Sequence, residues 1–252
     1  MSSSLGRVIN FPARRGTELA TDAMSRATSG INATATRLTA EHMGTVDDWG
    51  RDPRLVQVIT TLSHFRWSVA VGGEEHLKRR KGALIVVNAR RFALAPIFSA
   101  LAISEAVDRP VRFVGRPDTA PIGSLSRRIG GLLDHPDEVA GALSAGELVV
   151  MGAEHDPRLR EAGIVDHAHV GAAMLASVPV FPAATSSNPM GRDARVEIGP
   201  ATRPGRKRRG PLAELELADR VRADIQLLLD EMGELRTGTP LDWLPITAIG
   251  GS

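Results

Sequence analysis

The sequence feature that most constrains the fold is an uninterrupted apolar run, Ala83–Val87, preceded by Gly82 and followed by Asn88. A strand with one face in water alternates polar and apolar residues, whereas this run does not, so it predicts a strand buried on both faces. The residues that follow begin a helix. Open α/β sheets place their ligands where such a strand turns into a helix, so site chemistry is expected within residues 88–94.

Length and composition favour one large α/β domain. The chain has 252 residues, 42% of them hydrophobic, and no apolar run approaches the about 18 residues of a membrane-spanning helix. The first residues lack the apolar core of a secretory signal, and the absence of cysteine excludes disulfides. These features predict a cytoplasmic protein. The 31 basic and 29 acidic residues nearly balance, so any electropositive surface must come from local clustering.

The chain divides into a domain with a tail at each end. Residues 1–45 are rich in Ser, Thr, Ala and Gly and contain few large apolar side chains, which predicts a flexible tail; an amphipathic segment for a membrane or partner is the alternative. Residues 46–236 form the predicted domain, and 237–252 form a C-terminal tail. Strands are expected at 65–73, 82–88, 111–116, 148–156, 178–185 and 195–200, and helices at 53–62, 96–107, 137–146 and 214–235.

The apolar run and the turn after it resemble the first motif of the glycerolipid (lysophospholipid and 1-acylglycerol-3-phosphate) acyltransferase superfamily. In that family such a strand leads into Asn-His, followed by four residues and an Asp. The resemblance implies that the His is a general base and that the Asp orients it. Here Asn88 matches the Asn, Ala89 stands at the His position and Leu94 at the Asp position. Neither catalytic side chain is present, so the family's chemistry is not expected at this turn.

Three further blocks are similar to the same family in order and spacing. Arg116, after a strand, stands where the family has a basic residue that contacts phosphate, and a guanidinium suits phosphate; a salt-bridge partner is the alternative. The strand from Leu148 leads to a turn where the family has Phe-Pro-Glu-Gly. Straight alignment puts Ala153 on the Glu, and a slip of one residue puts Glu154 there. The fourth block, 171–185, is an Ala-rich helix followed by a strand containing two prolines.

The resemblance implies an α/β fold with a mixed, mostly parallel sheet flanked by helices, and a groove for an acyl chain and a phosphate. It implies no intact catalytic residue; Glu154 and His155 are candidates for a displaced base. Asn88, Arg116 and Arg158 are the candidate substrate and phosphate contacts. No cofactor is expected, and acyl-CoA or acyl carrier protein is the acyl donor if transfer occurs.

Two basic clusters are candidate contacts for an anionic membrane or an acidic partner. They comprise Lys78, Arg79, Arg80 and Lys81, and then Arg206, Lys207, Arg208 and Arg209. Solvated loops are the alternative interpretation of both. With the resemblance, they predict a peripheral protein on the inner face of the membrane, with a lipid or acyl chain as ligand and a lipid-synthesis protein as a possible partner.

Other chemistries are disfavoured. His155, Asp156, Asp166, His167 and His169 have the side chains of metal ligands, but their spacing is better explained by surface and core histidines, so no metal is predicted. The sequence has neither a phosphate-binding Gly-Lys-Ser loop nor a Gly-x-Ser-x-Gly nucleophile elbow. Few aromatic residues accompany the basic runs, so nucleic-acid binding is not expected.

Three hypotheses remain. The leading one is an acyltransferase-like protein that has lost catalysis and binds a lipid or acyl chain, or acts as a scaffold, at the membrane. The second is an active acyltransferase that moves an acyl group to a lysophospholipid or similar hydroxyl acceptor with a relocated base. The third is an interaction protein that has kept only the fold.

Overall fold

The computed structural model describes residues 46–66, 68–77, 81–89, 94–154, 162–187, 193–205 and 210–232. All of them belong to one compact unit, 45–252. The predicted tails, 1–45 and 237–252, lie outside the described residues.

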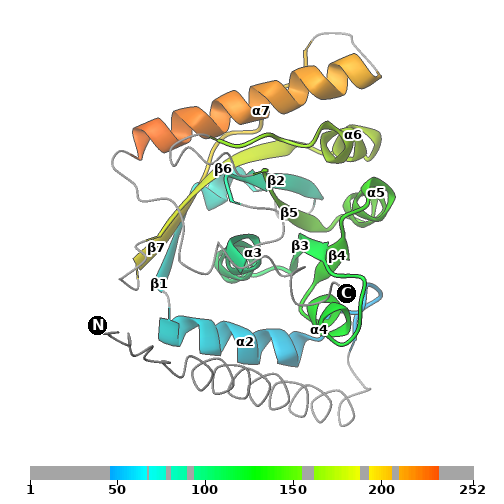
Figure 1. The fold of residues 1–252 in the computed structure, drawn as a ribbon. Helices are drawn as coiled ribbons and strands as arrows, with labels where there is room; N and C mark the ends of the chain where they lie inside the picture. Colours follow the sequence, from blue (N-terminus) through cyan, green and yellow to red (C-terminus); the bar gives the residue numbers. More distant parts are fainter. Residues whose placement is uncertain are drawn as a thin grey trace, which may run out of the picture. The chain divides into compact units, whose positions relative to one another are not determined.

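The described residues form a sheet of seven strands with the order β1-β7-β6-β2-β5-β3-β4 (Figure 1). The strands are β1 (Ser68–Gly72), β2 (Ala83–Val87), β3 (Val111–Arg116), β4 (Gly131–Leu133), β5 (Leu148–Gly152), β6 (Val180–Ser187) and β7 (Asp193–Ile198). The helices are α2 (Pro53–Arg66), the 3-10 turn η1 (Glu74–His76), α3 (Leu94–Ala106), α4 (Ile122–Arg128), α5 (Pro136–Ser144), α6 (His167–Leu175) and α7 (Pro211–Glu231).

The sheet is mixed and mostly parallel, as predicted. Within it β6 and β7 pair antiparallel, while β1 with β7 and all pairs among β2, β3, β4, β5 and β6 are parallel. Strands β2 to β6 therefore all end at the same edge of the sheet, which we call the C-terminal edge. The loops that leave it are where ligands of open α/β sheets bind.

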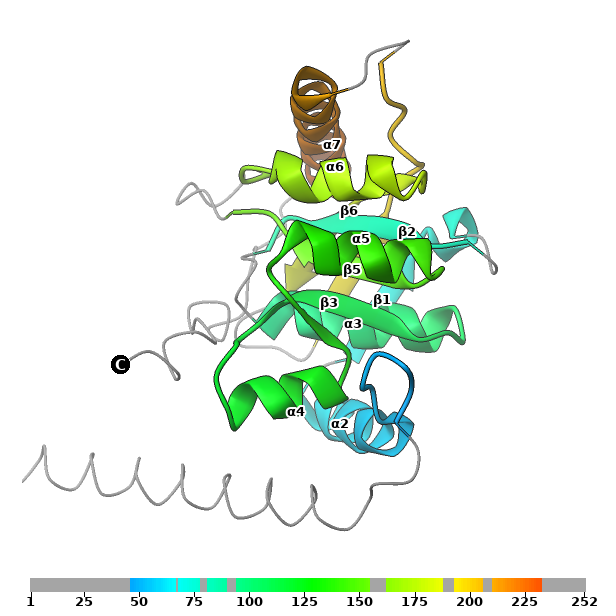
Figure 2. The same cartoon turned by 90° about the vertical axis from the view of Figure 1, so that its right-hand side faces the viewer.

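Helices cover both faces of the sheet and bury two apolar clusters (Figures 1 and 2). The α7-side cluster contains side chains of α5, α6 and α7 with one face of the strands. The α3-side cluster contains side chains of α2 and α3 with the other face. All five residues of β2 are buried, alternating between the two clusters, which explains why the strand sequence has no polar positions.

Local sequence signals account for most helix boundaries. The Asp52 carboxylate accepts hydrogen bonds from the backbone N–H of Arg54 (3.0 Å) and Leu55 (3.3 Å) and so caps the start of α2. Helix α7 begins at Pro211, three residues before the prediction, because proline is well suited to the first helical position. The strand predicted from Phe65 starts at Ser68, since α2 continues to Arg66.

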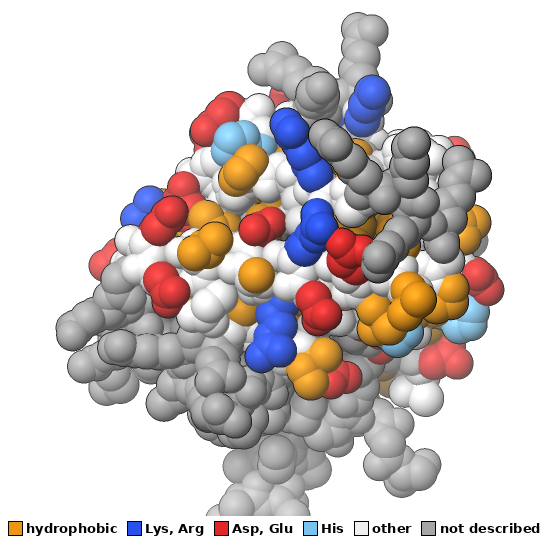
Figure 3. Space-filling view, turned by 90° about the horizontal axis from the view of Figure 1, so that it is seen from above, with side chains coloured by type: hydrophobic (Ala, Val, Ile, Leu, Met, Phe, Trp, Pro, Cys, Tyr) orange, Lys and Arg blue, Asp and Glu red, His pale blue; other side chains and the backbone are white. Residues whose placement is uncertain are grey.

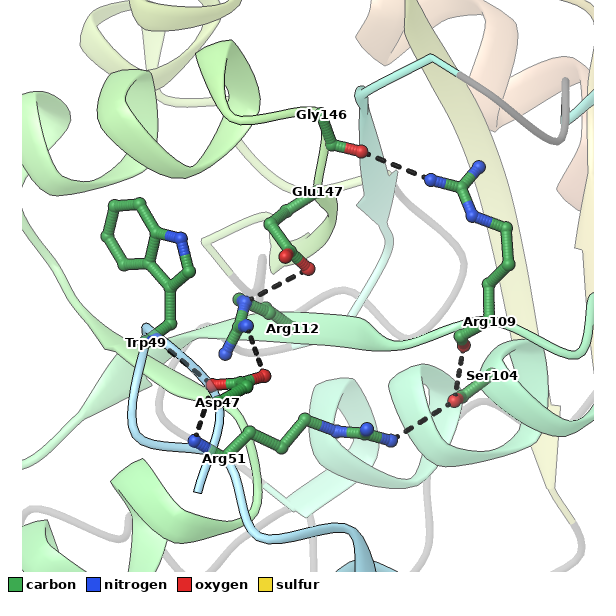
Figure 4. A network of polar contacts seen from close by, with 8 residues as sticks. All are labelled: Asp47, Trp49, Arg51, Ser104, Arg109, Arg112, Gly146 and Glu147. Atoms are coloured by element: carbon green, nitrogen blue, oxygen red, sulfur yellow. Dashed lines mark hydrogen bonds and ion pairs between the residues drawn. The ribbon is translucent and has the colours of Figure 1, made fainter. Parts of the chain in front are cut away.

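A network of charged side chains lies at the edge of the sheet opposite the C-terminal edge (Figure 4). Arg112, near the start of β3, is 1% exposed and forms ion pairs with Asp47 (2.7 Å) and Glu147 (3.1 Å). Its guanidinium lies 5.8 Å from the centre of the Trp49 ring. Burial, and secondly the positive charge of Arg112, lower the pKa of the neighbouring Arg51. The network fixes the chain segment before α2 to the sheet.

Among the described residues, no helix has both the length and the apolarity needed to cross a bilayer.

Candidate active site at the C-terminal edge

The strand connections define one position at the C-terminal edge where a ligand site is expected. From β2 the chain crosses through α3 to β3, and from β5 it crosses through α6 to β6. These helices pack on opposite faces of the sheet, and the connections leave the adjacent strands β2 and β5 in opposite directions. Open α/β sheets bind ligands at such a switch point. The residues that follow β2 and β5 are therefore the candidate site.

Asn88, directly after β2, fastens this turn to β6. Its side-chain oxygen accepts hydrogen bonds from the backbone N–H and the hydroxyl of Thr185, and its amide donates to the Thr185 carbonyl at 3.2 Å. An asparagine amide has two N–H donors and one acceptor oxygen, and the Thr185 carbonyl takes one of the two N–H groups. Asn88 is buried, and its main observed contact is with the neighbouring strand.

Ala89 and Leu94 are the apolar side chains at the switch point. Ala89 is 8% exposed and belongs to the α3-side cluster, and the partly buried Leu94 at the start of α3 packs against the same cluster. Neither side chain can accept or release a proton. The structure thus places both residues against the same apolar cluster, on one side of the sheet.

Glu154 is the carboxylate that the strand register brings to this position. Val87 pairs with Gly152, and the ladder continues with a hydrogen bond from the Ala153 N–H to the Val87 carbonyl at 2.8 Å. Ala89 and Glu154 each lie two residues beyond the last pair. Alternation along β5, whose Leu148 and Val150 belong to the α3-side cluster, puts Glu154 on the same face as Ala89.

The structure distinguishes the two possible alignments at the end of β5. Ala153 is fully buried in the α7-side cluster, whereas Glu154 is exposed and forms a backbone bridge with Ile164. Gly163, before Ile164, has φ +32°, and a Cβ there would collide with the Glu154 carbonyl. The one-residue slip that assigns the carboxylate role to Glu154 is thus the arrangement with an accessible side chain.

Arg116 ends β3, one strand away from the switch point beyond β5. Its guanidinium Nη2 lies 3.6 Å from the Oε1 of Glu138 in the first turn of α5, and its side chain is 14% exposed. The alternative interpretation, a salt-bridge partner, describes the contact in the structure. Gly115, with φ +112°, forms the irregularity in the pairing of β3 with β4 that sets the position of Arg116.

His169 joins two loops at this edge, an arrangement that sequence spacing did not reveal. The ring is 2% exposed; its Nε2 lies 3.1 Å from Asp134 and its Nδ1 lies 3.2 Å from Asp166. Both ring nitrogens thus lie within ion-pair distance of a carboxylate, although neither forms a well-aligned hydrogen bond with a described residue. The described residues contain no group of three or more potential metal ligands.

Other predicted site residues lie outside the described residues, namely His155, Arg158, Lys78, Arg79, Arg80, Arg206, Lys207, Arg208 and Arg209. Lys81 is described and exposed. Among the described residues in Figure 3, basic and acidic side chains are interspersed. On α7, Arg220 and Glu216 form an ion pair at 2.6 Å.

Comparison with known proteins supports the fold. No protein-family model and no curated protein sequence matches this chain. A solved structure, the 1-acyl-sn-glycerophosphate (LPA) acyltransferase PlsC from Thermotoga maritima, is similar with a TM-score of 0.52 and 17% sequence identity; the match covers 73% of this chain and 84% of that chain. The chain therefore has the acyltransferase-like α/β fold that its motifs predicted.

Proposed function

We propose that this protein binds an acyl lipid at the switch point between β2 and β5 without transferring the acyl group. The observation that carries the proposal is the apolar packing of two positions at the strand-helix turn, Ala89 and Leu94, which contact the α3-side cluster. Proton transfer requires a titratable group within hydrogen-bond reach of the acceptor hydroxyl. A turn with an alanine and a leucine in these positions offers apolar contact area instead.

Position in the fold supports the same proposal. The turn lies at the C-terminal edge, where the connections of β2 and β5 diverge, and the similar solved structure is an enzyme named for 1-acyl-sn-glycerophosphate. Apolar side chains beside exposed polar groups such as Glu154 suit an amphiphile, since the chain and the head group need different surroundings. The ligand class we propose is therefore an acyl chain that carries a polar head.

Membrane association is part of the proposal and depends on the basic clusters. The protein would contact the inner face of an anionic membrane through the cluster that ends at Lys81 and through residues 206–209, because clustered Lys and Arg are attracted to anionic lipids. A scaffold role toward a lipid-synthesis protein at that surface would use the same clusters.

A second candidate, an active acyltransferase, is favoured by one observation. The strand register puts Glu154 on the same face as Ala89, two residues beyond the last pair of β2 and β5. A carboxylate in that position, with or without His155, is a candidate base for an acceptor hydroxyl, with acyl-CoA or acyl carrier protein as donor. The two functions differ in turnover, which an assay can measure directly.

The first experiment identifies the ligand and its position. Native mass spectrometry of the full-length protein, followed by lipid extraction, should detect bound acyl lipid. Ile164→Arg places a charge beside Glu154 and should reduce the retained lipid at least fivefold. Leu227→Arg on α7 is the matched control, because Ile164 and Leu227 are both 60% exposed. Equal retention in the two variants would show that the lipid is bound elsewhere.

The second experiment tests for turnover. Purified protein is incubated with acyl-CoA and lysophosphatidic acid, and release of free thiol is measured. Bound lipid without turnover supports the binding function. Turnover that is lost in Glu154→Gln or His155→Ala, and kept in Glu231→Gln at the exposed end of α7, would establish the enzyme instead.

A further inference from the structure

The end of β3 presents a guanidinium whose Nε makes no hydrogen bond within the part of the chain that the structure describes. Arg116 is the last residue of β3, at the C-terminal edge, and its side chain is largely shielded from water. Its Nε forms no hydrogen bond with any described residue. Its ion pair with Glu138 has an N–O distance of 3.6 Å, which is longer than the about 2.7–2.9 Å of a strong charge-assisted hydrogen bond. Glu138 therefore balances the positive charge of Arg116 without forming a close hydrogen bond with its guanidinium.

Glu138 occupies the position that an anionic ligand of Arg116 would take. It lies in the first turn of α5, a nine-residue helix that begins at Pro136. A negative charge there is favoured by the helix dipole as well as by the guanidinium. A phosphate bound to Arg116 would need the same two sources of positive potential. Its charge would also lie beside the Glu138 carboxylate, and like charges at such distances repel.

We propose that Glu138 is a specificity-determining counter-ion that prevents Arg116 from binding phosphate, so that the site accepts an acyl ligand with an uncharged head group. The acyl part of this inference rests on the proposed function, whereas the counter-ion role concerns Arg116 and Glu138 alone. A neutral head group can contact the C-terminal edge of the sheet and leave the Glu138 carboxylate paired with Arg116. A phosphorylated head group must first separate the ion pair.

The counter-ion role is tested with a small probe that contains no acyl chain. Binding of sn-glycerol 3-phosphate to the full-length protein is measured by isothermal titration calorimetry. Glu138→Gln should bind this probe at least tenfold more tightly than the wild type does, and adding Arg116→Gln should remove the gain. Asp137→Asn is the matched control. It removes the same charge from the same helical turn, but Asp137 is 94% exposed and pairs with His135.

The outcomes separate the ion pair from a general effect of charge. Tight binding by Glu138→Gln alone supports the proposal. If the wild type binds the probe as tightly as Glu138→Gln does, or if Asp137→Asn gives the same gain, the counter-ion role is refuted. Circular dichroism of each variant verifies that the fold is intact, and Glu138→Asp, which keeps the charge, should bind like the wild type.

Head-group preference is then measured with acyl lipids by native mass spectrometry. The wild type should retain monooleoylglycerol in preference to lysophosphatidic acid, and Glu138→Gln should retain the two about equally. Preference of the wild type for lysophosphatidic acid would refute the inference. If no variant retains any acyl lipid while the glycerol 3-phosphate results are as expected, the proposed function fails, and the counter-ion role of Glu138 stands.

Discussion

From the network around Arg112 we predict how much one substitution lowers the free energy of unfolding. Arg112→Met keeps most of the apolar stem and removes the charge, leaving Asp47 and Glu147 without their shared partner (Figure 4). Removing one member of a buried ion pair costs about 3–5 kcal/mol. The low end applies here, because the two carboxylates are 34% and 22% exposed and regain water. We expect a loss of about 3 kcal/mol, which includes the contact with the Trp49 ring.

The control is an ion pair that is shorter but more exposed. Arg220 and Glu216 on α7 approach to 2.6 Å, with side chains 47% and 32% exposed. Exposed pairs contribute about 0.2–1 kcal/mol, so Arg220→Met should cost well under 1 kcal/mol. Burial, rather than distance, thus decides which arginine matters.

The assays are urea unfolding and thermal unfolding of the full-length protein, both monitored by far-UV circular dichroism. For a domain of this size, 3 kcal/mol corresponds to a fall in melting temperature of about 6–12 °C. The denaturant slope should be unchanged in both variants, since neither alters the area exposed on unfolding. If Arg112→Met is as stable as the wild type, or more stable, the free-energy cost of burying the Arg112 charge equals or exceeds the stabilisation from its two ion pairs. That result would refute the reasoning.

Three further stability predictions use the same assay. Gly73→Ala should cost at least about 2 kcal/mol, because Gly73 has φ +75° and a Cβ would collide with the Ile198 carbonyl; a cost below 0.5 kcal/mol would contradict this. Asn88→Ala removes the hydrogen bonds to Thr185 and should cost about 2–3 kcal/mol of stability. Asn88→Asp keeps an oxygen that can accept the two hydrogen bonds from Thr185, so it should cost less. His169→Ala should cost about 2–4 kcal/mol, since it opens a cavity and strands two carboxylates; an unchanged midpoint would show that the ring is not needed.

The sheet could be predicted because the pattern of polar and apolar residues in a strand reflects which of its faces are buried. The run Ala83–Val87 has no polar residue, and only a strand covered on both faces tolerates that. The structure confirms that β2 is central and buried. Boundaries were less accurate where two patterns overlap. Phe65 and Arg66 continue the helix α2, although their neighbours toward Gly72 alternate like a strand.

The contacts of the candidate site could not be predicted in the same way, because they join residues far apart in the sequence. Asn88 binds Thr185, 97 positions later, and His169 contacts Asp134, from which α5 and β5 separate it in the sequence. No local spacing encodes such pairs. They follow from the strand order, which places the ends of β2, β5 and β6 together. Arg116 was identified from its place after a strand, but its partner Glu138 was not.

The preserved fold is no argument for preserved catalysis. A buried His-Asp pair at the end of β2 would have to be held by hydrogen bonds, because burying polar groups costs free energy unless they are paired. Ala89 and Leu94 remove that requirement and add apolar contacts to the α3-side cluster. A turn with Ala89 and Leu94 therefore keeps the sheet intact without such a pair. The fold does not depend on catalytic residues at this turn, which is why turnover and lipid retention must be measured as independent quantities.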